Sequence, residues 1–176
     1  MSWLYHINRT NTARFALGIG GHFPLIFLGL NPSTAEPKNL DQTLKSVERI
    51  AIQNNYSCWV AINLYPQRAT NPCDLHSGCD PALHQKNLKH IENVLIFDQP
   101  VIWAAWGTQI IVRPYLLDCL RDIYELSKNY DCSWVTIGDL SKDGHPHHPL
   151  YLKKDSEMKD FDIEGYLKKM NETLKR

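Results

Sequence analysis

The chain lacks the features that mark several specialised classes of protein. Its five cysteines include no Cys-x-x-Cys pair, and their odd number predicts free thiols in a reducing cytosol. Neither charge dominates, because 19 Lys and Arg balance 19 Asp and Glu at a pI of about 7.1. The surface therefore has no strong basic field for holding long nucleic acid nonspecifically, although a local basic groove stays possible.

Signals for export and for membrane insertion are also lacking. The first ten residues do not show the charged-then-apolar pattern of a signal peptide, and no apolar run approaches membrane-spanning length. We therefore expect a cytoplasmic protein without a membrane partner. The length of 176 residues, with no internal repeat, predicts a single domain over residues 1–176.

The stretch Leu25–Ala35 organises the rest of the chain. Its first six residues are apolar or Gly, which predicts a short strand buried on both faces. Asn31 and Pro32 end the strand, since Pro has no N–H to donate and disfavours helix in the residue before it. The polar loop that follows contains Ser33 and Thr34, whose hydroxyls can accept hydrogen bonds from a turn.

Three more buried strands follow, each preceded by a helical pattern. Such alternation predicts an α/β fold with a parallel sheet, helices on both faces and right-handed crossovers. A β-hairpin is expected before it, formed by Trp3–Ile7 and Arg14–Leu17. The expected later strands are Cys58–Ile62, Val101–Ala105 and Trp134–Ile137, and the expected helices are Gln42–Asn54, a helix from Pro81 to Leu95, Thr108–Lys128 with a bend near Pro114, and Phe161–Arg176.

Candidate site residues follow the carboxyl ends of these strands. In a parallel sheet those ends share one edge, where ligands of open α/β folds bind, so we expect the four segments to meet in one cleft. They begin at Asn31, at Asn63, at Trp106–Gly107 and at the loop His145–His148.

Each candidate has a functional and a structural interpretation. Two amides, Asn31 and Asn63, suit a ligand with alternating donors and acceptors such as a nucleobase edge, but each could simply cap its own turn. Arg68 could hold a phosphate or carboxylate, or form a structural ion pair. Trp106 could stack on a ligand beside Gly107, or belong to the core.

Neither a metal nor a cofactor is favoured. His145, His147 and His148 lie on one Pro-containing loop, yet no matching Cys or His pair occurs elsewhere to complete a metal site. A single His acting as donor or acid/base fits better, with a surface turn as the alternative. The run Gly18–Gly21 precedes a strand instead of following one, so it fails the context of a dinucleotide loop. A Ser–His–Asp hydrolase is not indicated, since no Gly-x-Ser-x-Gly elbow is present.

The motifs resemble a bacterial family of small uncharacterised proteins. The matching runs are LNPSTAE, NLYPQRATNP, AWG and SKDGHPHHPLYL, and they span roughly residues 28–152. The same motifs also resemble, remotely, the uracil-DNA glycosylase superfamily. That superfamily has a Gly-x-Asp/Asn-Pro strand end, a base-reading Asn, a Trp-Gly strand end and a His-Pro loop, in the order found here at Asn31, Asn63, Trp106 and His148.

This second resemblance implies a fold and a chemistry. The implied fold is a three-layer α/β/α sandwich around a four-stranded parallel sheet of order 2-1-3-4. The implied roles are base reading by Asn63, water positioning by Asn31 and donation to the departing base by His148. Trp106 or Tyr65 would stack on the base, and Arg68 would hold a phosphate.

These observations lead to one leading hypothesis and two rivals. The leading hypothesis is a nucleobase-recognising enzyme that acts at an N-glycosidic bond of a nucleoside, nucleotide or nucleic acid. The rivals are a non-catalytic nucleotide or nucleic-acid binding module on the same cleft, and an enzyme with other chemistry on a modified base. The expected partner is a nucleobase-containing small molecule or nucleic acid, and the oligomeric state stays open.

Overall fold

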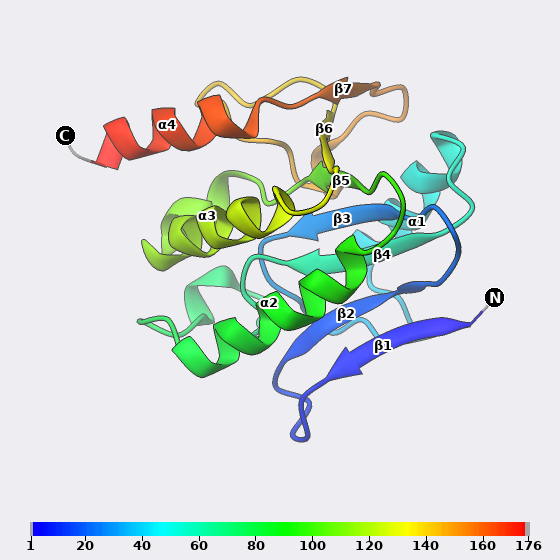
Figure 1. Cartoon of the computed structure of the whole chain (residues 1–176), viewed down its shortest axis with the longest axis horizontal. Coiled ribbons are helices and arrows are strands. Elements are labelled where there is room, and N and C mark those ends of the chain that lie inside the picture. Colours follow the sequence, from blue (N-terminus) through cyan, green and yellow to red (C-terminus); the bar gives the residue numbers. More distant parts are fainter. Residues whose placement is uncertain (1, 175–176) are drawn as a thin grey trace.

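A seven-stranded mixed sheet forms the centre of the molecule (Figure 1), in the computed structural model that describes residues 2–174. The strand order is β1-β2-β4-β3-β5-β6-β7. The strands are β1 (Trp3–Ile7), β2 (Arg14–Ile19), β3 (Leu25–Gly29), β4 (Trp59–Asn63), β5 (Val101–Ala104), β6 (Ser133–Ile137) and β7 (Met158–Asp160).

The expected four-stranded parallel sheet of order 2-1-3-4 is wrong, although the α/β class is confirmed. Strands β4, β3, β5 and β6 are parallel to one another, and three antiparallel pairings extend this group. At one edge the hairpin of β1 and β2 joins the sheet, because β2 pairs with β4 through Leu17↔Ala61. At the other edge the short strand β7 pairs with β6. The hairpin is thus part of the central sheet instead of an appendage to it.

The described residues form four α-helices and three short 3₁₀ turns, which lie between the strands except for α4, which follows β7. Their starts follow local chemistry: the Asp41 carboxylate accepts from the Leu44 N–H at 2.9 Å, and Asp80 caps a helix that begins with Pro81. Near Pro114 the expected third helix divides into a 3₁₀ turn and an α-helix. The helical elements are α1 (Gln42–Gln53), η1 (Pro72–Asp74), α2 (Pro81–Leu95), η2 (Thr108–Val112), α3 (Tyr115–Ser127), η3 (Pro149–Tyr151) and α4 (Ile163–Leu174).

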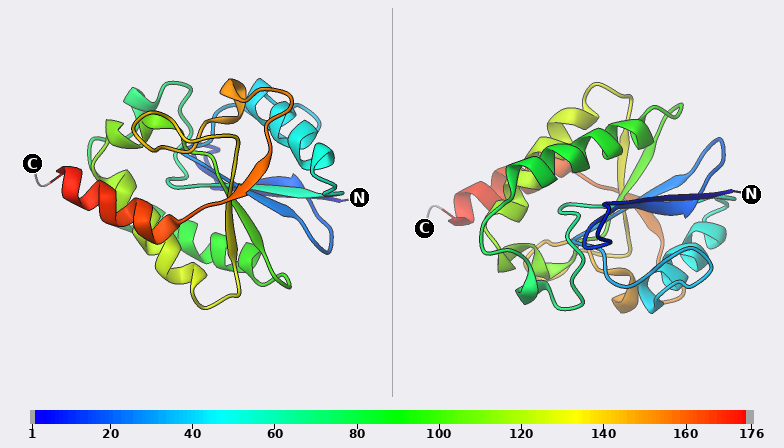
Figure 2. Two further views of the ribbon diagram at one scale, coloured as in Figure 1. Left: turned by 90° about the horizontal axis from the view of Figure 1, so that it is seen from above. Right: turned by 90° about the horizontal axis from the view of Figure 1, so that it is seen from below.

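The two faces of the sheet bury separate cores. Helices α2, α3 and α4 cover one face, where even-numbered strand residues such as Ile26, Val60 and Ile102 are buried. Helix α1 covers the other face, where odd-numbered residues such as Phe27 and Trp103 are buried, and η3 packs beside it (Figure 2). We call these the α2–α4 face and the α1 face. Among the described helices, none has the length and apolar character needed to cross a membrane.

Candidate functional site

The predicted site segments all start at the carboxyl ends of the central parallel strands, which we call the carboxyl edge of the sheet. Strands β3, β4, β5 and β6 run parallel, so their carboxyl ends share that edge. Backbone hydrogen bonds continue past the strand ends: the Leu64 N–H donates to Gly29 O at 2.9 Å, and the Ala105 N–H donates to Leu28 O at 3.0 Å. The Gly107 N–H donates to Pro146 O at 3.0 Å, which fixes the His145–His148 loop against the end of β5.

Asn63 is the buried amide of this edge. Its side chain is 2% exposed, and its Nδ2 has no hydrogen-bond partner within residues 2–174. The neighbouring residue on β3 is Gly29, at which a Cβ would lie 3.0 Å from Asn63 Oδ1 and 2.9 Å from the Phe27 ring. Glycine at this position therefore lets the amide and the aromatic ring approach each other on the α1 face. A buried amide N–H without an acceptor is costly. The Asn63 nitrogen is covered by the surrounding side chains in this structure, so an acceptor on a ligand would reach it only after those side chains move.

A second unpartnered donor lies beside the same ring. Trp103 packs edge-on against Phe27, with ring centroids 5.3 Å apart, and its indole N–H finds no acceptor in the described part of the chain. The Phe27 ring is thus flanked by Asn63 and by Trp103, which both carry a buried N–H group without an acceptor in the described residues. Phe27 was not predicted as a site residue, yet its sequence position gave a signal, because it alternates with Gly29 and so shares its face.

His148 lies at the same edge, on the segment that crosses the end of β5. Its Cβ is 3.4 Å from the position a Cβ would take at Gly107, whose φ of +71° favours glycine. The Leu150 N–H donates to His148 Nδ1 at 3.4 Å, so the neutral ring carries its hydrogen on Nε2. Burial lowers the pKa of His148, and Asp41 at the start of α1 partly opposes this effect. His148 is therefore a neutral imidazole at pH 7 with a donor at Nε2.

The loop after β3 is held by Asn31. Its amide donates to Pro32 O at 3.0 Å and to Ala69 O at 2.8 Å, so it joins this loop to the one after β4. The amide nitrogen is committed to the protein, which leaves Oδ1 as the atom that can accept from a water. Ser33 is half-buried, with its Oγ 3.3 Å from Thr70 Oγ1, and Thr34 is exposed.

Arg68, on the loop after β4, donates hydrogen bonds to the loop after β3 and to the N-terminal hairpin. Its Nη1 donates to Ser33 O and, at 3.3 Å, to Ala35 O, while Nε donates to Asn11 Oδ1 at 3.0 Å. Its Nη2 donates to the Tyr5 hydroxyl at 2.9 Å. Most of the guanidinium N–H groups are therefore bonded to the protein, and they hold the loop that contains Ser33 and Thr34 in place.

The two aromatic residues expected to stack on a ligand lie on the opposite face of the sheet from Asn63. Tyr65 and Trp106 both belong to the core of the α2–α4 face, with exposures of 0% and 1%. The Trp106 indole N–H donates to the Tyr166 hydroxyl at 3.1 Å, and that hydroxyl lies 2.8 Å from His145 Nδ1. Trp106 and His145 thus form a buried structural network with α4, and burial lowers the pKa of His145.

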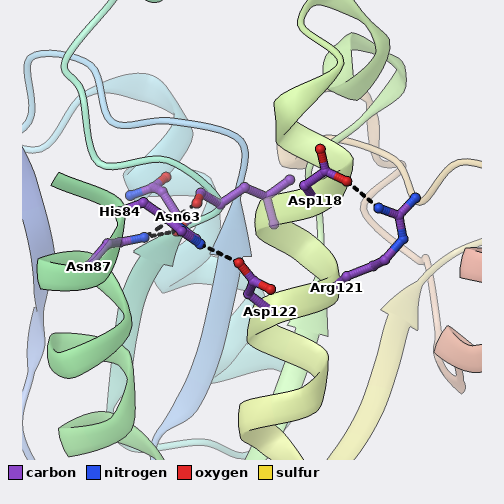
Figure 3. Close-up of polar contacts among 7 residues, drawn as sticks. Asn63, His84, Asn87, Asp118, Arg121 and Asp122 are labelled. Atoms are coloured by element: carbon purple, nitrogen blue, oxygen red, sulfur yellow. Dashed lines mark hydrogen bonds and ion pairs between the residues drawn. The ribbon is translucent and has the colours of Figure 1, made fainter. Parts of the chain in front are cut away.

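The end of β4 is supported from this second face by polar residues of α2 (Figure 3). Asn87, fully buried, donates to Asn63 O at 2.9 Å and to Leu64 O at 3.3 Å. One turn earlier, His84 Nε2 pairs with Asp122 Oδ2 of α3 at 2.8 Å. Asn87 therefore fixes the backbone from which the Asn63 amide projects, while His84 ties α2 to α3. Their sequence signal was the presence of polar residues at positions 84 and 87, on the helical face that also buries Ile91 and Val94.

The comparison with protein families places the chain among proteins without an established activity. The model of the family described as "Protein of unknown function (DUF1643)" matches residues 14–150. The chain belongs to the DUF1643 family. No curated protein and no solved structure shows significant similarity to it. The matched segment of this DUF1643 protein runs from the start of β2 into η3. It contains Asn31, Asn63, Arg68 and His148, whereas Tyr5 and Asn11, which bond to Arg68, precede it.

Proposed function

We propose that this DUF1643 protein recognises a nucleobase and acts at its N-glycosidic bond. The observation that carries the proposal is the buried Asn63 amide, with its Nδ2 unpartnered within the described chain, beside Phe27 and Gly29. An amide presents one donor and one acceptor side by side, which complements a base edge with a neighbouring carbonyl and ring N–H. Phe27, which is 3% exposed in this structure, is the proposed stacking ring for the base, the role first expected of Trp106 or Tyr65.

His148 is the proposed donor to the departing base. When the bond between the sugar C1′ and the base nitrogen breaks, the electron pair stays with the base and its carbonyl oxygen gains negative charge. A fixed N–H near that oxygen stabilises the charge, and the neutral His148 ring has its hydrogen on Nε2 for this purpose. Asn31 Oδ1 is the proposed hydrogen-bond acceptor for the water whose oxygen attacks C1′. The proton that this water loses is taken up by the departing base anion, so the step is a hydrolysis that yields free base.

Two features of the sequence support this proposal. The order of the four motifs is similar to that of the uracil-DNA glycosylase superfamily, which acts at the same type of bond. The balance of 19 positive and 19 negative side chains favours a small substrate or a nucleic-acid end over a long duplex. We therefore expect weak and steeply salt-dependent binding to duplex DNA.

The test is an assay for release of free base. The full-length protein is incubated with a panel of nucleosides, nucleotides and short oligonucleotides, and the free base is separated by chromatography. We expect release from at least one member, and loss of that release in His148→Ala. Binding of a base without release from any member of the panel would refute the catalytic part of the proposal.

A non-catalytic binding module is the second candidate, and Asn31 is the observation that favours it. Both contacts of its amide nitrogen are to backbone carbonyls, so the residue has a structural task irrespective of any reaction. A module of this kind would still use Asn63 and Phe27 to hold a base. It would shift the melting temperature with bases or nucleosides and leave the glycosidic bond intact.

A further inference from the structure

A polar groove lies between the loops that follow β3 and β4. It has a volume of about 350 Å³ and is lined by residues that include Ser33, Thr34, Glu36, Arg68 and Thr70. A second groove of about 500 Å³ shares Arg68 with the first and extends it toward His76. Volumes of about 300–1,000 Å³ are usual for small-molecule sites.

A closed cycle of hydrogen bonds builds the wall of this groove. Arg68 Nε donates to Asn11 Oδ1, and Asn11 Nδ2 donates to Glu36 Oε1 at 3.2 Å. On the other side, Arg68 Nη2 donates to the Tyr5 hydroxyl, which donates to the same Glu36 Oε1 at 3.4 Å. Both paths end on one oxygen of the carboxylate, so Glu36 is held in position while its Oε2 can accept from a ligand.

The charges of the groove favour a neutral ligand that carries hydroxyl groups. Four of the five guanidinium N–H groups of Arg68 have protein acceptors, which leaves one, whereas a bidentate grip on phosphate needs two. The Glu36 carboxylate would also repel a phosphate. Its Oε2, together with the Ser33 and Thr70 hydroxyls, instead offers acceptors and donors that suit a sugar diol.

The groove starts close to the base site along the chain. Ser33 is four residues beyond Gly29, a span of at most about 14 Å, and Arg68 is five residues beyond Asn63. We infer that this groove takes the ribose diol of a ribonucleoside whose base lies at Asn63, so that the substrate class is a ribonucleoside without a bound phosphate in the groove. This inference rests on the proposed function for the position of the base, whereas the hydroxyl recognition by Glu36 is an independent claim.

The test compares matched ligands by isothermal titration with the full chain. The probes are the four common ribonucleosides, their 2′,3′-dideoxy forms and the corresponding free bases. We expect a ribonucleoside to bind about tenfold more tightly than its dideoxy form, because only the former has the diol. In Glu36→Gln we expect this ratio to fall toward one while the affinity for the free base stays unchanged. The Gln Oε1 can still accept from Asn11 and Tyr5, so the wall of the groove should persist in this variant. Glu172→Gln, on the exposed side of α4, is the matched control.

The outcomes separate this inference from the proposed function. If a free base binds but the ribose and dideoxy forms bind equally, or if Glu36→Gln keeps the tenfold ratio, the diol site is refuted and base recognition stands. If neither bases nor nucleosides bind, base recognition is refuted, and methyl β-D-ribofuranoside then tests the groove alone by NMR. Shifts of the Thr34 and Thr70 amide signals that disappear in Glu36→Gln would support the diol site, and their absence would overturn it.

Discussion

The hydrogen bonding of the polar groups at the carboxyl edge differs between the two faces of the sheet. On the α2–α4 face, Trp106, Tyr166 and His145 form a connected network, and Phe161 packs against Trp106. On the α1 face, the Asn63 amide lies beside Gly29 without an acceptor for its Nδ2 among residues 2–174. Buried polar groups in folded proteins are nearly always paired, so an unpaired one at a strand edge needs an explanation.

We interpret this difference in terms of the proposed function, in which the first face serves stability and the second face binds the base. The large aromatic side chains of the first face have satisfied hydrogen bonds, although His84 Nδ1 and Asn87 Oδ1 of α2 lack partners among the described residues. The second face has the unpaired Asn63 amide nitrogen beside a glycine. The two asparagines that follow strands repeat the contrast, since the amide nitrogen of Asn31 has two carbonyl partners and that of Asn63 has none in the described chain. Natural proteins accept such local costs at functional sites.

The largest expected effect on stability comes from Trp106→Ala. This change removes a fully buried indole and leaves the Tyr166 hydroxyl without its donor, so we expect a loss of about 3–5 kcal/mol in unfolding free energy. Urea unfolding followed by circular dichroism measures it. A loss below about 1 kcal/mol, combined with weaker ligand binding, would mean that Trp106 serves the site.

The sequence predicted those parts of the fold that depend on interactions between residues close together in the chain. Periodicity and caps gave α1, α2 and the inner strands to within one or two residues. The partner of β2 could not be predicted, since the pairing Leu17↔Ala61 joins residues 44 positions apart. Strand β7 was missed because three residues, two of them charged, show no alternation of buried positions.

For the site, the sequence located the segments but not the direction of their side chains. Asn63 ends β4 and His148 lies on the loop after β6, close to where they were expected, because that depends on order along the chain alone. Trp106 and Tyr65 also lie beyond strand ends. Alternation turns Trp106 toward the other core, whereas Tyr65 reaches that core because the alternation stops after β4, where Leu64 and Tyr65 are both buried in it. Applied from Gly29 backwards, the same alternation would have pointed to Phe27.

The second prediction concerns His148 and His145, which share one loop. His145 belongs to the buried network of the α2–α4 face, whereas His148 lies toward α1. His148→Ala should lower the rate of base release roughly a hundred- to a thousandfold, the usual effect of losing one donor to a developing negative charge. Its melting temperature should stay close to that of the wild type. His145→Ala should do the reverse, because His145 bonds to Tyr166 in the core. Equal effects on rate and melting temperature in both variants would assign the whole loop a structural role.

Gly29→Ala tests the close approach on the α1 face. The added Cβ would meet Phe27 at 2.9 Å and Asn63 Oδ1 at 3.0 Å, so we expect loss of base binding and a destabilisation of about 1–3 kcal/mol. Gly20→Ala is the control, since its Cβ would meet nothing closer than 3.7 Å. Thermal unfolding with and without the free bases measures both effects. Unchanged base binding in Gly29→Ala would place the ligand elsewhere.

A smaller effect is expected from pH. Burial lowers the pKa values of His145 and His148, and burial together with the neighbouring His6 and Lys86 lowers that of His90. The folded state therefore binds fewer protons than the unfolded state, whose histidines titrate near 6.5. The contribution of these histidines to the unfolding free energy is therefore fully present above pH 6.5. It declines as the pH falls from 6.5 through their lowered pKa values. Urea midpoints at pH 7.5 and pH 5.5 measure this decline, and His90→Gln should reduce it.

The central claim, that the Asn63 amide serves a ligand instead of the fold, is tested most directly by the unfolding free energy of Asn63→Leu. Leucine has a similar size and no N–H to leave unpaired, so we expect stability to stay equal or to rise by about 1 kcal/mol while base binding is lost. The same substitution at Asn87 is the matched control and should cost roughly 2 kcal/mol, since it leaves Asn63 O and Leu64 O without their donor. A loss at Asn63 as large as the loss at Asn87, with base binding retained, would contradict the account.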